Sequence, residues 1–117
     1  MRILVLEDHE GTRFALEVTL EGEGHEVVSF ASGESALEHL KNERVDCILM
    51  DWNMPGISGT DFIRAVKELS IEPFRAQIGV LSGERRILPT APQLGCDFFL
   101  MKPYSPIDLF TELAAGA

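Results

Sequence analysis

The sequence predicts an α/β fold in which a five-stranded parallel sheet is covered by helices on both faces, in the doubly wound arrangement. Five short apolar runs alternate with segments of helical periodicity along the 117 residues. Several of these runs are continuous, as is typical of strands buried on both faces. Strand–helix alternation requires right-handed crossovers, which generate a parallel sheet. The length indicates one domain, which we expect to extend over residues 1–117.

The predicted strands are the apolar runs at residues 3–6, 27–30, 45–50, 78–81 and 98–101. Between these runs, apolar residues recur at the spacing of a helix face. The shared faces are Phe14, Ala15 and Val18; Ala36, Leu37 and Leu40; Phe62, Ile63, Val66 and Leu69; and Ile107, Phe110, Leu113 and Ala114.

Two of the predicted helices begin with capping residues. Ser58 and Ser105 are each placed to accept a hydrogen bond from a backbone N–H of the first turn. Asp61 and Asp108 follow three residues later, in the positive end of the helix dipole. Pro106 takes the first helical position, where its missing N–H costs nothing.

The segment 83–95 fits the alternating pattern poorly. The pattern places the fourth helix here, but Pro89 and Pro92 each remove a backbone donor and clash with the preceding turn. We therefore expect a short or irregular fourth helix at most.

Charge and composition exclude several classes of protein. Ten Lys and Arg against 19 Asp and Glu give a net charge of −9, which disfavours a nucleic-acid partner because phosphate neutralisation needs clustered cations. No apolar run approaches the ~20 residues that span a bilayer, and the run before Glu7 is too short for a signal peptide. Cys47 and Cys96 lie inside apolar runs, which favours two buried, reduced thiols over a disulfide. We expect a cytoplasmic protein without a membrane partner.

Polar residues follow four of the five predicted strands. Glu7 and Asp8 follow the first, Asp51 the third, Ser82 the fourth and Lys102 the fifth. Since ligands of an open parallel sheet bind outside the carboxyl ends of its strands, we expect these side chains to meet at one edge. Each residue alone is explained by a turn, a cap or a solvated pair, but their joint occurrence favours a functional site.

The chemistry of this set points to a metal ion and a phosphoryl group. Three neighbouring carboxylates raise at least one pKa unless a cation joins them. Mg²⁺ (or Mn²⁺) binds one or two carboxylates together with waters and a phosphoryl oxygen. A carboxylate beside the ion is a competent nucleophile, and Lys102, Ser82 and the metal can each neutralise one phosphoryl oxygen. The sequence therefore predicts an acyl phosphate on Asp51.

These residues resemble the receiver domain of two-component response regulators. The resemblance rests on Glu7-Asp8, Asp51-Trp52-Asn53-Met54-Pro55-Gly56, Ser82 and Lys102-Pro103, and it covers nearly the whole chain. It implies the flavodoxin-like strand order 2-1-3-4-5. It also implies that the chain is no enzyme beyond its own phosphotransfer and autodephosphorylation.

The resemblance further implies the partners. A histidine kinase or a histidine phosphotransfer protein supplies the phosphoryl group to Asp51, and phosphorylation then switches a partner-binding surface. The downstream target is a protein that the sequence does not identify, and a phosphorylation-dependent dimer is a further expectation.

Roles of single residues also follow from the resemblance. Asp8 and Asp51 ligate Mg²⁺ directly, Glu7 acts mostly through water, and the backbone carbonyl of Asn53 completes the protein ligands. Lys102 pairs with the phosphoryl group, and its peptide bond to the following proline is cis.

The remaining roles concern switching and dephosphorylation. Ser82 takes the position of the switch hydroxyl, and Phe99 takes that of the switch aromatic residue. Asn53 and Glu84 fall at the positions that flank the attacking water and tune the lifetime of the acyl phosphate.

Alternatives from other classes remain open at this point. A stand-alone Mg²⁺-dependent phosphohydrolase with an aspartyl nucleophile is disfavoured, because Asp51-Trp52-Asn53 lacks the Asp-x-Asp acid and the length leaves no room for a cap domain. The intact acidic pair, acceptor and lysine disfavour a receiver-like scaffold that works without phosphorylation. A flavodoxin is disfavoured because the first strand leads to carboxylates and not to a phosphate-binding loop.

Overall fold

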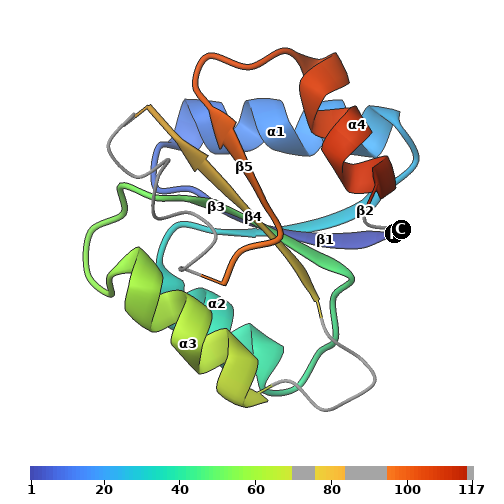
Figure 1. The fold of residues 1–117 in the computed structure, drawn as a ribbon. Coiled ribbons are helices and arrows are strands. Elements are labelled where there is room, and N and C mark those ends of the chain that lie inside the picture. Colours follow the sequence, from blue (N-terminus) through green and yellow to red (C-terminus); the bar gives the residue numbers. More distant parts are fainter. Residues whose placement is uncertain (70–75, 84–94, 116–117) are drawn as a thin grey trace.

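The computed structural model describes residues 1–69, 76–83 and 95–115, and it places a five-stranded parallel sheet between two layers of helices (Figure 1). In chain order the elements are β1 (Arg2–Leu6), α1 (Glu10–Gly22), β2 (Glu26–Phe30), α2 (Gly33–Leu40), β3 (Cys47–Asp51), α3 (Gly59–Leu69), β4 (Gln77–Ser82), β5 (Phe98–Met101) and α4 (Pro106–Ala115). The strand order β2-β1-β3-β4-β5 confirms the predicted topology. Helices α1 and α4 cover one face of the sheet, and α2 and α3 cover the other.

Two sequence predictions concern residues outside these ranges. The short or irregular helix between β4 and β5, with Pro89 and Pro92, lies outside the described residues, as does Glu84. Within the described ranges, no helix is long and apolar enough to cross a membrane.

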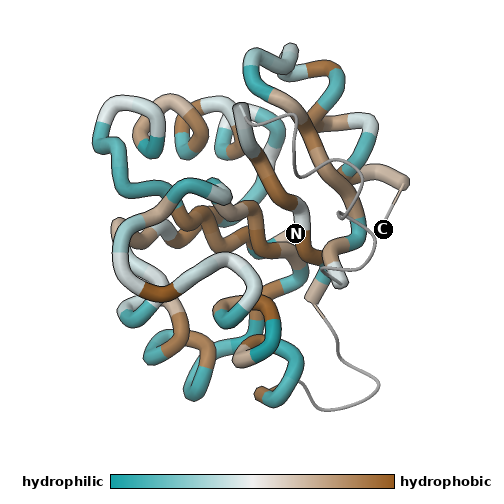
Figure 2. Tube along the Cα trace, turned by 60° about the vertical axis from the view of Figure 1, so that its left-hand side comes forward, coloured by the Kyte–Doolittle hydropathy of each residue, from teal (hydrophilic) through white to brown (hydrophobic). Residues whose placement is uncertain are grey.

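Successive residues of each strand contribute to opposite layers of the core. In β1, Ile3 and Val5 pack with α1 and α4, whereas Leu4 and Leu6 pack with α2 and α3. The chain is most hydrophobic where the strands run through the middle of the molecule (Figure 2). Burial on both faces explains why residues 3–6 of β1 and 47–50 of β3 are continuous apolar runs.

The register of the sheet aligns the carboxyl ends of its strands. Leu6 of β1 pairs with Met50 of β3, and Ser82 of β4 pairs with Met101 of β5. The residues that follow these positions, or end the strands, therefore emerge at the same edge. The alignment therefore brings the predicted polar residues together at the carboxyl edge of the sheet.

The buried face of α1 differs from the one that the sequence predicts. Phe14 and Val18 are 64% and 54% exposed, and Ala15 is exposed as well. Leu16 and Leu20 are buried against the sheet instead. Both apolar pairs are spaced four residues apart, so periodicity alone could not decide which pair faces the core.

The final helix shows a smaller difference of the same kind. Ile107, placed by the sequence on the apolar face, is 73% exposed, whereas Leu109 and Leu113 are buried. Leu109 and Leu113 pack against the sheet in the same core cluster as the buried residues of α1.

The predicted helix caps are confirmed. The backbone N–H of Asp61 donates to Ser58 Oγ at 3.1 Å, and that of Asp108 donates to Ser105 Oγ at 3.2 Å. The Ser105 N–H in turn donates to the Asp108 carboxylate, which completes a capping box. Pro106 is the first residue of α4, as predicted.

The two cysteines are free thiols, as expected. Cys47 is buried in β3, and burial raises the pKa of its thiol to about 12. Cys96 is only partly buried, so the prediction of two buried thiols is wrong for this residue.

The orientation of α1 predicts unequal effects of two substitutions. Leu20→Ala is expected to lower the free energy of unfolding by about 2–5 kcal/mol, because it opens a cavity in the core. Val18→Ala, on the exposed face, is expected to change it by less than about 0.5 kcal/mol. Urea unfolding of both variants measures the difference, and equal losses would contradict this orientation of the helix.

Candidate functional site

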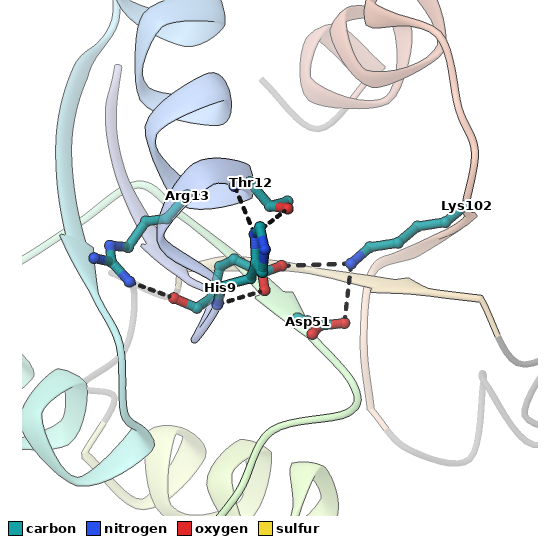
Figure 3. A network of polar contacts seen from close by, with 6 residues as sticks. His9, Thr12, Arg13, Asp51 and Lys102 are labelled. Carbon is teal, nitrogen blue, oxygen red and sulfur yellow. Dashed lines mark hydrogen bonds and ion pairs between the residues drawn. The ribbon is translucent and has the colours of Figure 1, made fainter.

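Three of the predicted site residues meet at the carboxyl edge of the sheet. Glu7 follows β1, Asp51 ends β3 and Lys102 follows β5. Strand alternation assigns all three to the face that α1 and α4 cover. The Lys102 Nζ lies 3.2 Å from Asp51 Oδ1 and 3.4 Å from Glu7 Oε2. Figure 3 shows the Lys102 side chain reaching towards Asp51 from the segment that follows β5.

An acidic cluster surrounds this ammonium. One ligand oxygen from each of Glu7, Asp8 and Asp51 lies within 4.8 Å of the other two. Glu7 and Asp51 are only 2% and 7% exposed, whereas Asp8 is open to solvent. Among the described residues, the three carboxylates outnumber the Lys102 ammonium that pairs with two of them, and all the donors are hard oxygens. This donor set fits Mg²⁺ or Mn²⁺.

The pKa of Glu7 reflects its burial first, and then a backbone hydrogen bond and the neighbouring charges. Burial raises the pKa of its carboxyl above the ordinary 4.5, and the charge of Asp51 raises it further. The backbone N–H of His9, which donates to Glu7 Oε1 at 3.1 Å, and the Lys102 ammonium lower the pKa but do not cancel the increase. The Glu7 carboxyl therefore holds its proton more strongly than an ordinary glutamate does.

The raised pKa predicts how stability varies with pH. The folded protein keeps a proton on Glu7 that the unfolded chain releases above about 4.5, so this contribution to stability is lost as pH rises through the raised pKa. Glu7→Gln, which mimics the protonated side chain, is expected to gain stability relative to the original protein as pH rises. Urea unfolding over a pH series without metal tests this, and a difference that stays constant with pH would contradict it.

Residues at the start of α1 contact Glu7 and cap the helix; Figure 3 labels three of them, His9, Thr12 and Arg13. His9 caps the helix, because its Nδ1 accepts the Thr12 backbone N–H at 3.1 Å and lies 3.0 Å from Thr12 Oγ1. The Arg13 guanidinium donates to the Glu7 backbone carbonyl at 3.0 Å. Sequence reasoning missed these residues, and the available signal was the spacing of His9 and Thr12 at the helix start.

Tyr104, the single tyrosine of the chain, is another residue that sequence reasoning missed. Its ring packs against the core under α1 and α4. Burial, and then the charges of Glu7 and Asp51, raise the pKa of its phenol to about 12. This residue therefore lies within the electric field of the acidic cluster.

The remaining predicted residues that the structure describes lie within or after β3, β4 and β5. Ser82 is fully buried at the end of β4, and its carbonyl accepts the Lys102 N–H at 2.8 Å. Phe99 is partly buried against the core formed with α2 and α3. Asn53 is exposed in the loop that follows β3. The peptide bond between Lys102 and Pro103 is cis, as the resemblance implied.

The fold and this arrangement define a receiver domain. A sequence model of the response regulator receiver domain matches residues 3–114. The chain therefore belongs to this family, the receiver domains of two-component signalling.

Individual relatives agree with this assignment. The chain is 33% identical over 119 residues to the sensory/regulatory protein RpfC of Xanthomonas campestris, covering 97% of this chain and 16% of that protein. Chemotaxis response regulator CheY4 of Vibrio cholerae has a TM-score of 0.88 at 30% identity, covering 99% of this chain and 98% of that one.

A third relative was solved with a metal ion. The receiver domain of sensor histidine kinase PA1611 from Pseudomonas aeruginosa has a TM-score of 0.86 at 26% identity, covering 97% of this chain and 94% of that one. That structure has a magnesium ion coordinated in its active-site cleft.

Proposed function

We propose that this receiver domain accepts a phosphoryl group on Asp51 from the phosphohistidine of a histidine kinase or a histidine phosphotransfer protein, in a reaction that requires Mg²⁺ or Mn²⁺. One observation carries the proposal. Glu7, Asp8 and Asp51 offer oxygens within 4.8 Å of one another, and Lys102 lies 3.2 Å from Asp51.

In the proposed reaction, one Asp51 carboxylate oxygen attacks the phosphorus atom. The bond from phosphorus to the donor's histidine nitrogen breaks, and its electron pair stays on that nitrogen. Lys102 balances charge on the phosphoryl oxygens, because its ammonium already lies at the Asp51 carboxylate. Asp8, Asp51 and the Asn53 carbonyl would hold the metal ion, with Glu7 acting mostly through water. When bound, the ion neutralises carboxylate and phosphoryl oxygens.

The switching roles belong to the same proposal. Ser82, at the end of β4 beside Lys102, supplies the hydroxyl that responds to the phosphoryl group. Phe99, partly buried on β5, supplies the aromatic side chain that moves with it. Asn53 and Glu84 tune the lifetime of the acyl phosphate.

Helix α1 is the surface that we assign to the phosphodonor. It begins two residues after Asp8, so a protein bound to it lies beside the acidic cluster. Phe14 and Val18 are exposed on this helix and offer apolar contact area to such a donor.

The wider features of the protein are also proposals. We propose that residues 1–117 act as one receiver unit, that the chain catalyses nothing beyond its own phosphorylation and dephosphorylation, and that phosphorylation changes its binding to a downstream protein or a second copy. A cytoplasmic location remains a prediction from the sequence.

Mass spectrometry of phosphodonor-treated protein tests the proposed function. With Mg²⁺ and a small phosphodonor such as acetyl phosphate, the mass should increase by one phosphoryl group, and a chelator should prevent the increase. Phosphorylation that proceeds equally well with Mg²⁺ and with the chelator would contradict the proposal. Turnover of a phosphomonoester panel would instead support the hydrolase alternative.

A further inference from the structure

The loop at residues 52–58, between β3 and α3, is held by a side chain of α2. The Ile57 backbone N–H donates to Glu34 Oε1 at 3.1 Å. The same carboxylate lies against Gly56, where an added Cβ would stand 3.0 Å from Oε1 and 3.4 Å from Oε2. Gly56 also has a φ of +86°, which favours glycine. Glu34 therefore fits the backbone of the loop closely.

Side-chain packing reinforces this contact at both ends of the loop. The Ile57 side chain lies on Gly33, the residue before Glu34, where a Cβ would approach Ile57 Cγ2 to 2.3 Å. At the other end, the Trp52 N–H donates to the Leu81 carbonyl at 2.9 Å. The Trp52 ring lies on Gly59, where a Cβ would come within 2.3 Å of it. Hydrogen bonds thus hold the loop to β4 at its start and to α2 near its end.

We propose that Glu34 is a positioning residue for the acidic site, and that it acts through the 52–58 loop. The inference rests on the proposed function, in which the Asn53 carbonyl binds the metal ion. A backbone carbonyl has no side-chain torsion with which to adjust, so its place depends on how both ends of its loop are held. Asp51 fixes the loop's start as the last residue of β3, and Glu34 fixes the far end.

A purely structural role for Glu34 makes a different prediction. As an acid in the first turn of α2, it also interacts favourably with the helix dipole. Loss of that interaction would lower stability but leave metal affinity and the loop unchanged. The two roles therefore separate in measurements of metal binding and of local amide exchange.

The test compares three variants by calorimetric titration with Mg²⁺ and by hydrogen exchange of the Ile57 amide in metal-free protein. Glu34→Ala is expected to weaken Mg²⁺ binding roughly tenfold and to speed exchange at Ile57. Glu34→Gln should restore both, because its Oε1 still accepts the hydrogen bond. Glu38→Ala is the control, since Glu38 is an exposed acid on the same helix, paired with Lys41 at 3.1 Å. It should change neither quantity.

The outcomes distinguish this inference from the proposed function. If the original protein binds no Mg²⁺, both the inference about Glu34 and the proposed function are overturned. If it binds Mg²⁺ and Glu34→Ala binds equally well, the inference alone is overturned. Equal weakening by Glu38→Ala would indicate a general charge effect and would also overturn it, as would a failure of Glu34→Gln to restore binding.

Discussion

Asp51→Asn is expected to abolish phosphoryl incorporation from a small phosphodonor in the presence of Mg²⁺. The amide has nearly the shape of the carboxylate, so the end of β3 should keep its structure. The amide oxygen, however, carries no full charge and is a poor nucleophile. Mass spectrometry of the treated variant should therefore show only the unmodified mass.

A matched control makes this result specific. Asp61→Asn changes an exposed aspartate at the start of α3, which pairs with Arg64 at 3.2 Å, and it should leave labelling unchanged. Circular dichroism should show that both variants are folded. Persistent labelling of Asp51→Asn at the original rate would exclude Asp51 as the acceptor.

Lys102→Ala is expected to impair both transfer and metal-free stability. Transfer should slow by roughly 10²-fold, because one preorganised cation is lost from the developing phosphoryl charge. Two buried carboxylates, Glu7 and Asp51, also lose their ammonium partner. The free energy of unfolding should fall by about 1 kcal/mol, the low end of the usual cost, since the Lys102 side chain is 32% exposed.

Mg²⁺ should offset this loss of stability. A ligand that binds only the folded state stabilises it, and the variant's uncompensated carboxylates should favour a dication more than those of the original protein. Urea unfolding with and without saturating Mg²⁺ measures the difference. Lys41→Ala, which removes an exposed ion pair with Glu38, is the control. Equal Mg²⁺ stabilisation of the Lys102→Ala and original proteins would contradict this view of the cluster.

The fold was largely predictable because its main signal is local. A strand covered on both faces is apolar along its buried length, as at residues 3–6 of β1 and 47–50 of β3, so these segments stood out in the sequence. The orientation of α1 was not predictable in this way. Its sequence offers two apolar pairs at the same spacing, Phe14 with Val18 and Leu16 with Leu20, and only contact with the sheet decides between them.

The site residues that lie at the ends of strands could be predicted from the sequence. Glu7, Asp51 and Lys102 end or follow apolar runs, and parallel topology brings such positions to one edge. The supporting residues gave no comparable signal. Arg13 reaches the Glu7 carbonyl and Glu34 reaches the Ile57 amide only because helices pack beside the sheet in a particular way. Contacts of this kind depend on tertiary structure and not on a sequence pattern.

Calorimetric titration with Mg²⁺, combined with Trp52 fluorescence and thermal unfolding, tests the central claim most directly. That claim is that the acids at the carboxyl edge form one divalent-cation site. The predicted result is one ion bound per chain, a change in Trp52 emission and a higher thermal midpoint, with all three effects weakened in Asp8→Asn. A titration without heat of binding, emission change or shift of the midpoint would contradict it.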